Sequence, residues 1–250
     1  MPGFNLSTLK TIKMTTNYTI PKKLLSNGST NAKTAKNSIK TFILYLSPYT
    51  QNSKKINICV KASKGCAASC LWSAGRGAFN SVKNSRINKT EYYLDQKENF
   101  IKQLAKEITT KHKTAVKRNE KIAFRLNGTS DLDFVYLLKK YAALDIQTLT
   151  NAVFYDYTKI LGKVKKYLGH KNYFLTFSRA EDNENETMEA LKIGANVSAV
   201  FANDLPKQYK GFKVVDGDKS DIVMIYNKNA ILGLKAKGAA KKDTTGFVIN

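Results

Sequence analysis

Short apolar runs alternate with helical patterns through most of the chain. Apolar, β-branched runs bounded by turn residues predict strands, and apolar residues recurring every three or four positions predict helices. The predicted strands are 39–48, 121–128, 151–158, 172–179, 196–201, 212–217, 221–226 and 230–238. The predicted helices are 133–144, 160–169 and 185–195, with a mostly helical stretch at 79–119 whose apolar stripe is Phe100, Leu104 and Ile108.

This alternation predicts an α/β fold with a mainly parallel sheet covered by helices. An open or incomplete (β/α) barrel fits the pattern best, and a doubly wound sheet is the alternative. Residues 1–38 are rich in Lys, Ser, Thr and Asn and hold few apolar clusters, so they are predicted to form a flexible basic arm. Residues 39–250 are then expected to form a single α/β domain.

The charge is large and unevenly distributed. Lys and Arg number 42 against 19 Asp and Glu, a net charge of +23, and residues 1–90 hold no acid before Glu91. Codon bias in an AT-rich genome explains many lysines, but Asp and Glu codons are also compatible with such a genome. A polyanionic partner, most simply DNA or RNA, is therefore expected.

Other global features exclude several classes of protein. No run of about 18 apolar residues is present, so no membrane span and no membrane partner are expected. The N-terminus has no apolar core typical of a signal peptide, so a cytoplasmic protein is expected. The cysteines are three, an odd number, which does not favour a disulfide framework.

Polar side chains follow the predicted strands at their carboxyl ends, where parallel α/β folds place their working groups. Any one of them could instead cap the next helix or turn. The candidate catalytic residues are Asn127, Asp131, Asp156, Tyr157, Lys159, Ser178 and Arg179. The candidate cofactor-binding residues are Gly128, Thr129, Ser130, Lys235 and Lys237, the two lysines as contacts for a phosphate or carboxylate.

All three cysteines lie in one basic loop, with the spacing Cys59-x6-Cys66-x3-Cys70. Three thiolates suit a [4Fe–4S] cluster with one open iron. Structural zinc usually takes four ligands, and the fourth would have to be a distant His112 or His170. Buried thiols without metal are the remaining alternative.

Several distinctive segments are spread along nearly the whole chain, among them "NAKTAK" (31–36), "GCAASCLWSAGRGAFN" (65–80), "RLNGTSDLDF" (125–134) and "LTFSRAEDNE" (175–184). In order and spacing they resemble an uncharacterised family of tailed-phage proteins and, more distantly, the phage gene product 88 group. The resemblance implies a phage protein in the cytoplasm of an infected bacterium. It implies no established activity.

The layout is also similar to that of radical S-adenosylmethionine enzymes, with cysteines after the first strand and a glycine motif after the second. The resemblance implies a cluster on the cysteines and S-adenosylmethionine near Gly128, although the cysteine spacing differs from the usual one. The resulting hypothesis is an iron–sulfur protein acting on a nucleic acid or nucleotide. The alternatives are a non-catalytic DNA- or RNA-binding protein, or a magnesium-dependent nuclease or phosphotransferase using Asp131, Asp133, Asp216, Asp218 and Asp221.

Overall fold

The computed structural model describes residues 18–30, 34–73 and 75–250. The strands are β1 (Leu25–Asn27), β2 (Lys40–Leu44), β3 (Ile122–Arg125), β4 (Ala152–Thr158), β5 (Tyr173–Ser178), β6 (Val197–Phe201), β7 (Gln208–Tyr209), β8 (Phe212–Asp216), β9 (Ile231–Lys235) and β10 (Val248–Ile249). The α-helices are α1 (Lys64–Ala68), α2 (Asn80–Asp95), α3 (Lys97–Lys117), α4 (Phe134–Ala142), α5 (Leu161–Tyr167), α6 (Glu184–Lys192) and α7 (Val223–Tyr226). Short 3-10 turns are η1 (Gly28–Thr30), η2 (Thr34–Lys36), η3 (Leu71–Ser73), η4 (Gly75–Ala78), η5 (Ile146–Thr148) and η6 (Gly238–Lys242).

The described strands form one sheet in the order β1-β2-β3-β4-β5-β6-β9-β8-β7, and β10 pairs with β6. The pairs from β2 through β6 and β9 to β8 are parallel, whereas β1 with β2 and β7 with β8 are antiparallel. The sheet is open, with β1 and β7 at its two ends. The prediction of a mainly parallel α/β sheet is therefore confirmed, while closure toward a partial barrel stays a prediction.

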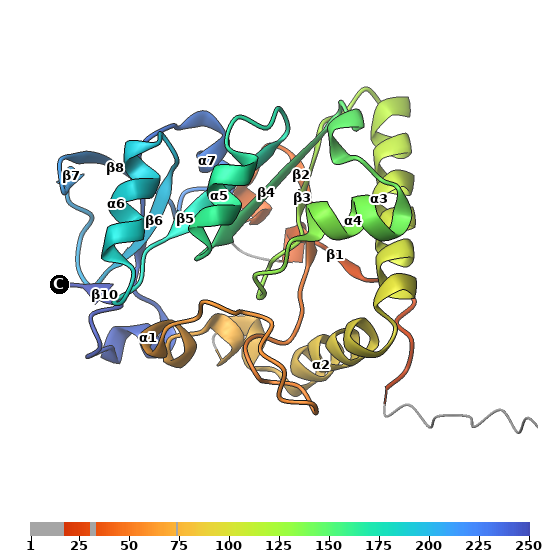
Figure 1. Cartoon of the computed structure of the whole chain (residues 1–250), viewed down its shortest axis with the longest axis horizontal. Helices are drawn as coiled ribbons and strands as arrows, with labels where there is room; N and C mark the ends of the chain where they lie inside the picture. Colours follow the sequence, from red (N-terminus) through yellow and green to blue (C-terminus); the bar gives the residue numbers. More distant parts are fainter. Residues whose placement is uncertain (1–17, 31–33, 74) are drawn as a thin grey trace, which may run out of the picture.

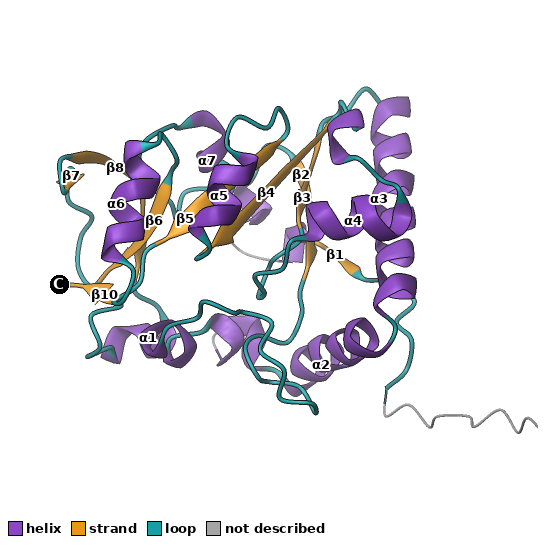
Figure 2. Cartoon of the chain, in the orientation of Figure 1, coloured by secondary structure: helices purple, strands orange, loops and turns teal. Residues whose placement is uncertain are grey.

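One face of the sheet is built on aromatic residues in register. Phe42 pairs with Phe124 and Phe124 with Phe154, with ring centroids 5.7 and 5.0 Å apart. Helices α3 to α6 cover this face (Figure 2). The predicted stripe of α3 packs here, with Phe100, Leu104 and Ile108 fully buried.

The predicted helical stretch 79–119 is divided into two helices. Gln96 has φ −130° and ψ 54°, outside the helical region, so α2 ends before it and α3 begins after it. The break allows Tyr92 and Tyr93 of α2 to pack edge-on against Phe100 of α3, with centroids 5.5 and 5.4 Å away.

The opposite face packs against α7, where Ile222 and Met224 meet Tyr155. The prediction of a strand at 221–226 is wrong, because this segment contains α7. Asp221 accepts hydrogen bonds from Arg125 at 3.1 Å and from the Tyr155 hydroxyl at 3.3 Å. These bonds hold the segment across the face of the sheet, away from an edge where its backbone could pair.

The structure also differs from the predicted arm at residues 1–38. Leu24 and Leu25 are buried, and their backbone N–H groups donate to the Glu107 carboxylate at 2.7 and 3.0 Å. With β1 paired to β2, the folded part of the chain begins well before residue 39. Residues 1–17 and 31–33 of the predicted arm lie outside the described residues. None of the described helices is long and apolar enough to cross a membrane.

Candidate functional site

The carboxyl ends of the parallel strands lie at the edge of the sheet next to α1 and α2 (Figure 1). Residues 45–79, called the cap from here on, lead away from the end of β2 and contain α1, η3 and η4. The C-terminal residues return to the same edge, where β10 pairs with the end of β6. Because ligands of open parallel sheets bind at this edge, the side chains beneath the cap form the first candidate site.

The three cysteines lie in the cap as half-buried free thiols. The Cys59 sulfur accepts a hydrogen bond from the Tyr49 N–H at 3.4 Å and donates one to the Thr129 carbonyl at 3.7 Å. Cys66 lies in α1, and its N–H donates to the hydroxyl of the N-cap residue Ser63 at 3.1 Å. These bonds attach the cap to the loop after β3 and fix the start of α1.

The charges of the thiols interact with one another. Burial raises the pKa of Cys59 to about 12, and the charges of Cys70 and Cys66 also raise it. Burial raises the pKa of Cys70 too, although Arg86 and Lys159 act against the rise. Burial therefore favours the neutral thiol form of both Cys59 and Cys70.

The described residues contain no preformed metal site. Among them, no group of three or more His, Cys, Asp or Glu side chains is placed to hold a metal ion. Burial lowers the pKa of His112 and His170, which favours the neutral imidazole that binds metal. Neither histidine, however, belongs to a group of three or more potential ligands among the described residues. The geometry therefore gives no support to the predicted [4Fe–4S] cluster or to S-adenosylmethionine, and both stay predictions.

Asp131 is held by donors from the next strand and helix. Its carboxylate accepts from the Thr158 hydroxyl at 3.0 Å, the Lys159 N–H at 2.9 Å and the Lys163 ammonium at 2.9 Å. The side chains of Lys163 and Asp131 are 5% and 11% exposed. This predicted catalytic carboxylate therefore acts first as a buried link between the loop after β3 and the start of α5.

Asn127 and Asp156 form a second buried network beneath the cap. The backbone N–H of Asn127 donates to Asp156 at 2.7 Å and its side-chain amide donates at 3.2 Å. The side-chain Oδ1 of Asn127 in turn accepts from the Ser130 hydroxyl at 2.9 Å. The Tyr173 hydroxyl donates to Asp156 at 3.3 Å. Burial raises the pKa of Asp156 to about 6, while Lys163 and Asn127 act against the rise.

The other predicted residues at this edge contact separate partners. The Ser178 hydroxyl pairs with the Ser198 hydroxyl at 3.1 Å, and the Arg179 guanidinium donates to the Phe247 carbonyl at 2.9 Å. The Lys159 ammonium lies 5.6 Å from the centre of the Phe247 ring. Tyr157 lies on the α7 face of the sheet, where the centre of its ring is 4.9 Å from the Arg125 guanidinium.

The two lysines predicted to meet a phosphate or carboxylate are already paired. Lys235 binds Asp204 at 2.8 Å and Lys237 binds Asp218 at 2.8 Å. Both lysines are exposed. The predicted set therefore shares one edge of the sheet, but its members satisfy one another or nearby groups and form no single constellation.

Sequence reasoning missed Arg86, which comes from α2 and lies buried beneath the cap. Its guanidinium lies 4.8 Å from the centre of the Tyr45 ring and 5.8 Å from the centre of the Trp72 ring. Gly77, which follows the cysteines in the sequence, is an indirect signal of close packing around Arg86. A Cβ at Gly77 would lie 2.6 Å from the Leu71 carbonyl oxygen and 3.3 Å from Arg86 Nη1.

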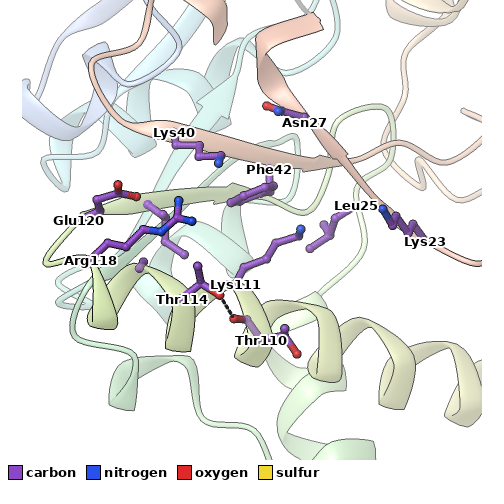
Figure 3. Close-up of a pocket in the computed structure, with 12 residues that line it drawn as sticks. Lys23, Leu25, Asn27, Lys40, Phe42, Thr110, Lys111, Thr114, Arg118 and Glu120 are labelled. Carbon is purple, nitrogen blue, oxygen red and sulfur yellow. Dashed lines mark hydrogen bonds between the residues drawn. The ribbon is translucent and has the colours of Figure 1, made fainter.

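A second candidate site lies around α3, where β2 and β3 begin. A groove of about 480 Å³ opens between these strands and the C-terminal half of α3. Figure 3 shows Lys40, Lys111 and Arg118 pointing into this groove, which Lys23 and Glu120 also line.

A further hollow of about 760 Å³ lies between α3 and the end of α4. Its charged residues are Lys102, Lys106, Lys113 and Lys140, with no acid among the described residues that line it. Helix α3 therefore has a basic groove on each of two sides.

Comparison with known proteins gives one positive result. The family model described as gene product 88 matches residues 22–250, a range that includes the sheet, the cap and both grooves. No curated protein and no solved structure matches the chain. The resemblance to radical S-adenosylmethionine enzymes therefore stays a likeness of layout. The phage likeness is direct, and the chain belongs to the gene product 88 family of phage proteins.

Proposed function

We propose that this phage protein binds nucleic acid through its phosphates, along the two grooves beside α3. The observation that carries the proposal is a concentration of cations of which most have no acidic partner among the described residues. Eight Lys and Arg side chains line the two grooves, against the single acid Glu120. Among the described residues, one of these eight has an ion pair, Lys102 with Glu98 at 2.5 Å. Phosphate oxygens would supply the missing partners.

Lys111 shows the electrostatic cost of this arrangement. Its ammonium lies 4.2 Å from the centre of the Phe42 ring. Burial lowers the pKa of Lys111. The charge of Glu107 raises this pKa, and the charges of Lys23 and Lys40 lower it further. Like charges held this close oppose folding, and a bound polyanion would convert their repulsion into attraction.

The lysine-rich composition alone does not account for the grooves. At the carboxyl edge of the same sheet, lysines have acidic partners: Lys235 binds Asp204 and Lys237 binds Asp218, each at 2.8 Å. The two grooves differ in having only one acid, Glu120, among their described lining residues. Phosphate contacts of this kind position a protein on nucleic acid without reading bases, so sequence-tolerant binding is expected.

The test is a charge-removing variant with Lys40→Gln, Lys111→Gln and Arg118→Gln. Binding to labelled DNA and RNA duplexes is measured by fluorescence anisotropy over a series of salt concentrations. The wild type should show a steep fall of log affinity with log salt. Because each lost phosphate contact removes about 0.9 from the slope, the variant's slope should be shallower by up to about 3.

The matched control removes the same charge elsewhere, with Lys207→Gln, Lys213→Gln and Lys219→Gln. These three lysines are exposed: Lys207 directly precedes β7, Lys213 lies in β8 and Lys219 follows β8. The β7–β8 hairpin lies far from α3 (Figure 1). The control should keep most of the wild-type slope. Equal losses in both variants would show that net charge alone drives binding, and an unchanged slope in the groove variant would refute the assignment.

A further inference from the structure

Arg86 is a buried cation that lacks hydrogen-bond partners on two of its three guanidinium nitrogens. Its relative exposure is 8%, and its Nε and Nη1 atoms have no hydrogen-bond partner among the residues that the structure describes. The Tyr45 and Trp72 rings lie close to the guanidinium. These are cation–π contacts, which leave the hydrogen-bonding capacity of Nε and Nη1 unused. Buried polar groups are normally paired, so an arginine left in this state points to an absent partner.

The surroundings of Arg86 are built to hold it in place. Gly77 allows the cap to pass close to the guanidinium, since a Cβ there would lie 3.3 Å from Nη1. Tyr45 directly follows β2 and is itself held in position. A Cβ at Gly128, after β3, would lie 2.6 Å from the Tyr45 ring. Two glycines therefore permit the close packing that fixes Arg86 over the carboxyl ends of β2 and β3.

A second cation lies at the same carboxyl edge of the sheet. Lys159 directly follows β4, and its ammonium lies 5.6 Å from the centre of the Phe247 ring. Phe247 in turn packs against the cap, since a Cβ at Gly65 of α1 would lie 2.6 Å from its Cβ. The described residues include no ion pair of Lys159. Among these residues, two cations without acidic partners thus lie beneath the cap, and the charges of both act on the Cys70 thiol.

We propose that Arg86 and Lys159 bind the oxyanion group of a ligand, a phosphate or a carboxylate, beneath the cap. Arginine is suited to this role because its planar guanidinium matches both groups and stays charged when buried. The position agrees with the general location of ligands at the carboxyl ends of parallel strands. This site lies at the carboxyl edge of the sheet, whereas the grooves lie beside α3. The proposal therefore does not depend on the proposed nucleic-acid binding.

Thermal unfolding of the full chain, dialysed free of oxyanions, tests the proposal. Sodium phosphate, sodium succinate and a short oligonucleotide are titrated separately at an ionic strength held constant with sodium chloride. The wild-type melting temperature should rise with at least one of them, because a ligand that binds the folded state stabilises it. Which one acts distinguishes a free phosphate, a carboxylate and a nucleic-acid phosphate as the source of the group.

The decisive variant is Arg86→Met, with Arg76→Met as the matched control in the same cap, where Arg76 is exposed. Arg86→Met should lose the anion-induced rise and, without anion, melt no lower than the wild type, because it removes a buried charge without a partner. Arg76→Met should keep the rise. A wild type that responds to none of the three probes, or an Arg86→Met protein that still responds, would overturn the proposal.

If Arg86→Met does not fold, Lys159→Met provides the second measurement. The Lys159 ammonium contacts the Phe247 ring, which a methionine side chain can still contact. A response retained in full by Lys159→Met would refute the two-cation site. A response reduced several-fold would support it.

Discussion

Replacing Asp156 with Asn should weaken the pH dependence of stability between about pH 4 and 6. Asp156 is 2% exposed, and burial raises its pKa to about 6. The pKa of an unfolded Asp is about 3.9. Because folding raises the pKa, the folded protein keeps a proton that the unfolded chain releases in this window. The associated stability is present below about pH 4 and is lost as the pH rises through 6. At about 1.4 kcal/mol per pKa unit, the loss is about 3 kcal/mol.

The assay is urea unfolding of the wild type and Asp156→Asn at several pH values from 4 to 7. The amide stays neutral, so the difference in unfolding free energy should move by about 3 kcal/mol in favour of the variant as the pH rises. Titration of the other carboxylates is common to both proteins and cancels. An amide donor facing the Asn127 side chain adds a cost that does not depend on pH. A difference that stays constant over the range would refute the inference that folding raises the pKa of Asp156.

Three further predictions concern the cap and the loop after β3. Gly65→Ala should cost about 1–3 kcal/mol, because its Cβ would lie 2.6 Å from the Phe247 Cβ; an unchanged melting temperature would contradict this close packing. Lys163→Met should cost about 3 kcal/mol in urea unfolding, because it leaves the Asp131 carboxylate half-buried without its cation; a variant as stable as the wild type would show that the pair contributes no net stability. Cys59 should react with iodoacetamide at pH 7.5 far more slowly in the folded than in the urea-unfolded protein, because its pKa is raised to about 12, and equal rates by mass spectrometry would argue against that burial.

The sheet could be predicted from the sequence because its strands are short apolar runs with clear ends. The strands predicted at 151–158 and 172–179 appear as Ala152–Thr158 and Tyr173–Ser178. The segment 221–226 has the same apolar composition, yet it folds as α7. Asp221, at the start of this segment, forms an ion pair with Arg125, 96 positions earlier in the sequence, a contact that no local pattern reveals.

The placement of several candidate residues in the fold could be predicted from the sequence, but their contacts could not. Strand topology correctly indicated that Asn127, Asp131 and Asp156 would share the carboxyl edge. Whether such groups await a ligand or satisfy one another depends on hydrogen bonds, which spacing does not specify. Arg86 was missed for the opposite reason: an arginine among Asn, Ser and Lys on α2 has the pattern of an exposed residue, and its burial arises only when the cap folds over it.

The carboxyl edge of the sheet and the surface around α3 differ in how their charges are balanced. This difference allows the two proposals to be tested separately. At the carboxyl edge most charged groups have partners, as in the pair of Lys163 with Asp131. The proposed oxyanion site there consists of the buried Arg86 and the half-buried Lys159. Around α3 the unpaired cations are numerous and mostly exposed, which suits a polyanion and does not select a small ligand. Binding at the grooves should therefore depend steeply on salt, because it releases counterions from the nucleic acid. Binding at Arg86 should depend far less on salt, because buried charges are weakly screened. We expect the groove variant to keep the oxyanion response and the Arg86→Met protein to keep its nucleic-acid affinity. Both results together would establish that the grooves and the site at Arg86 act independently.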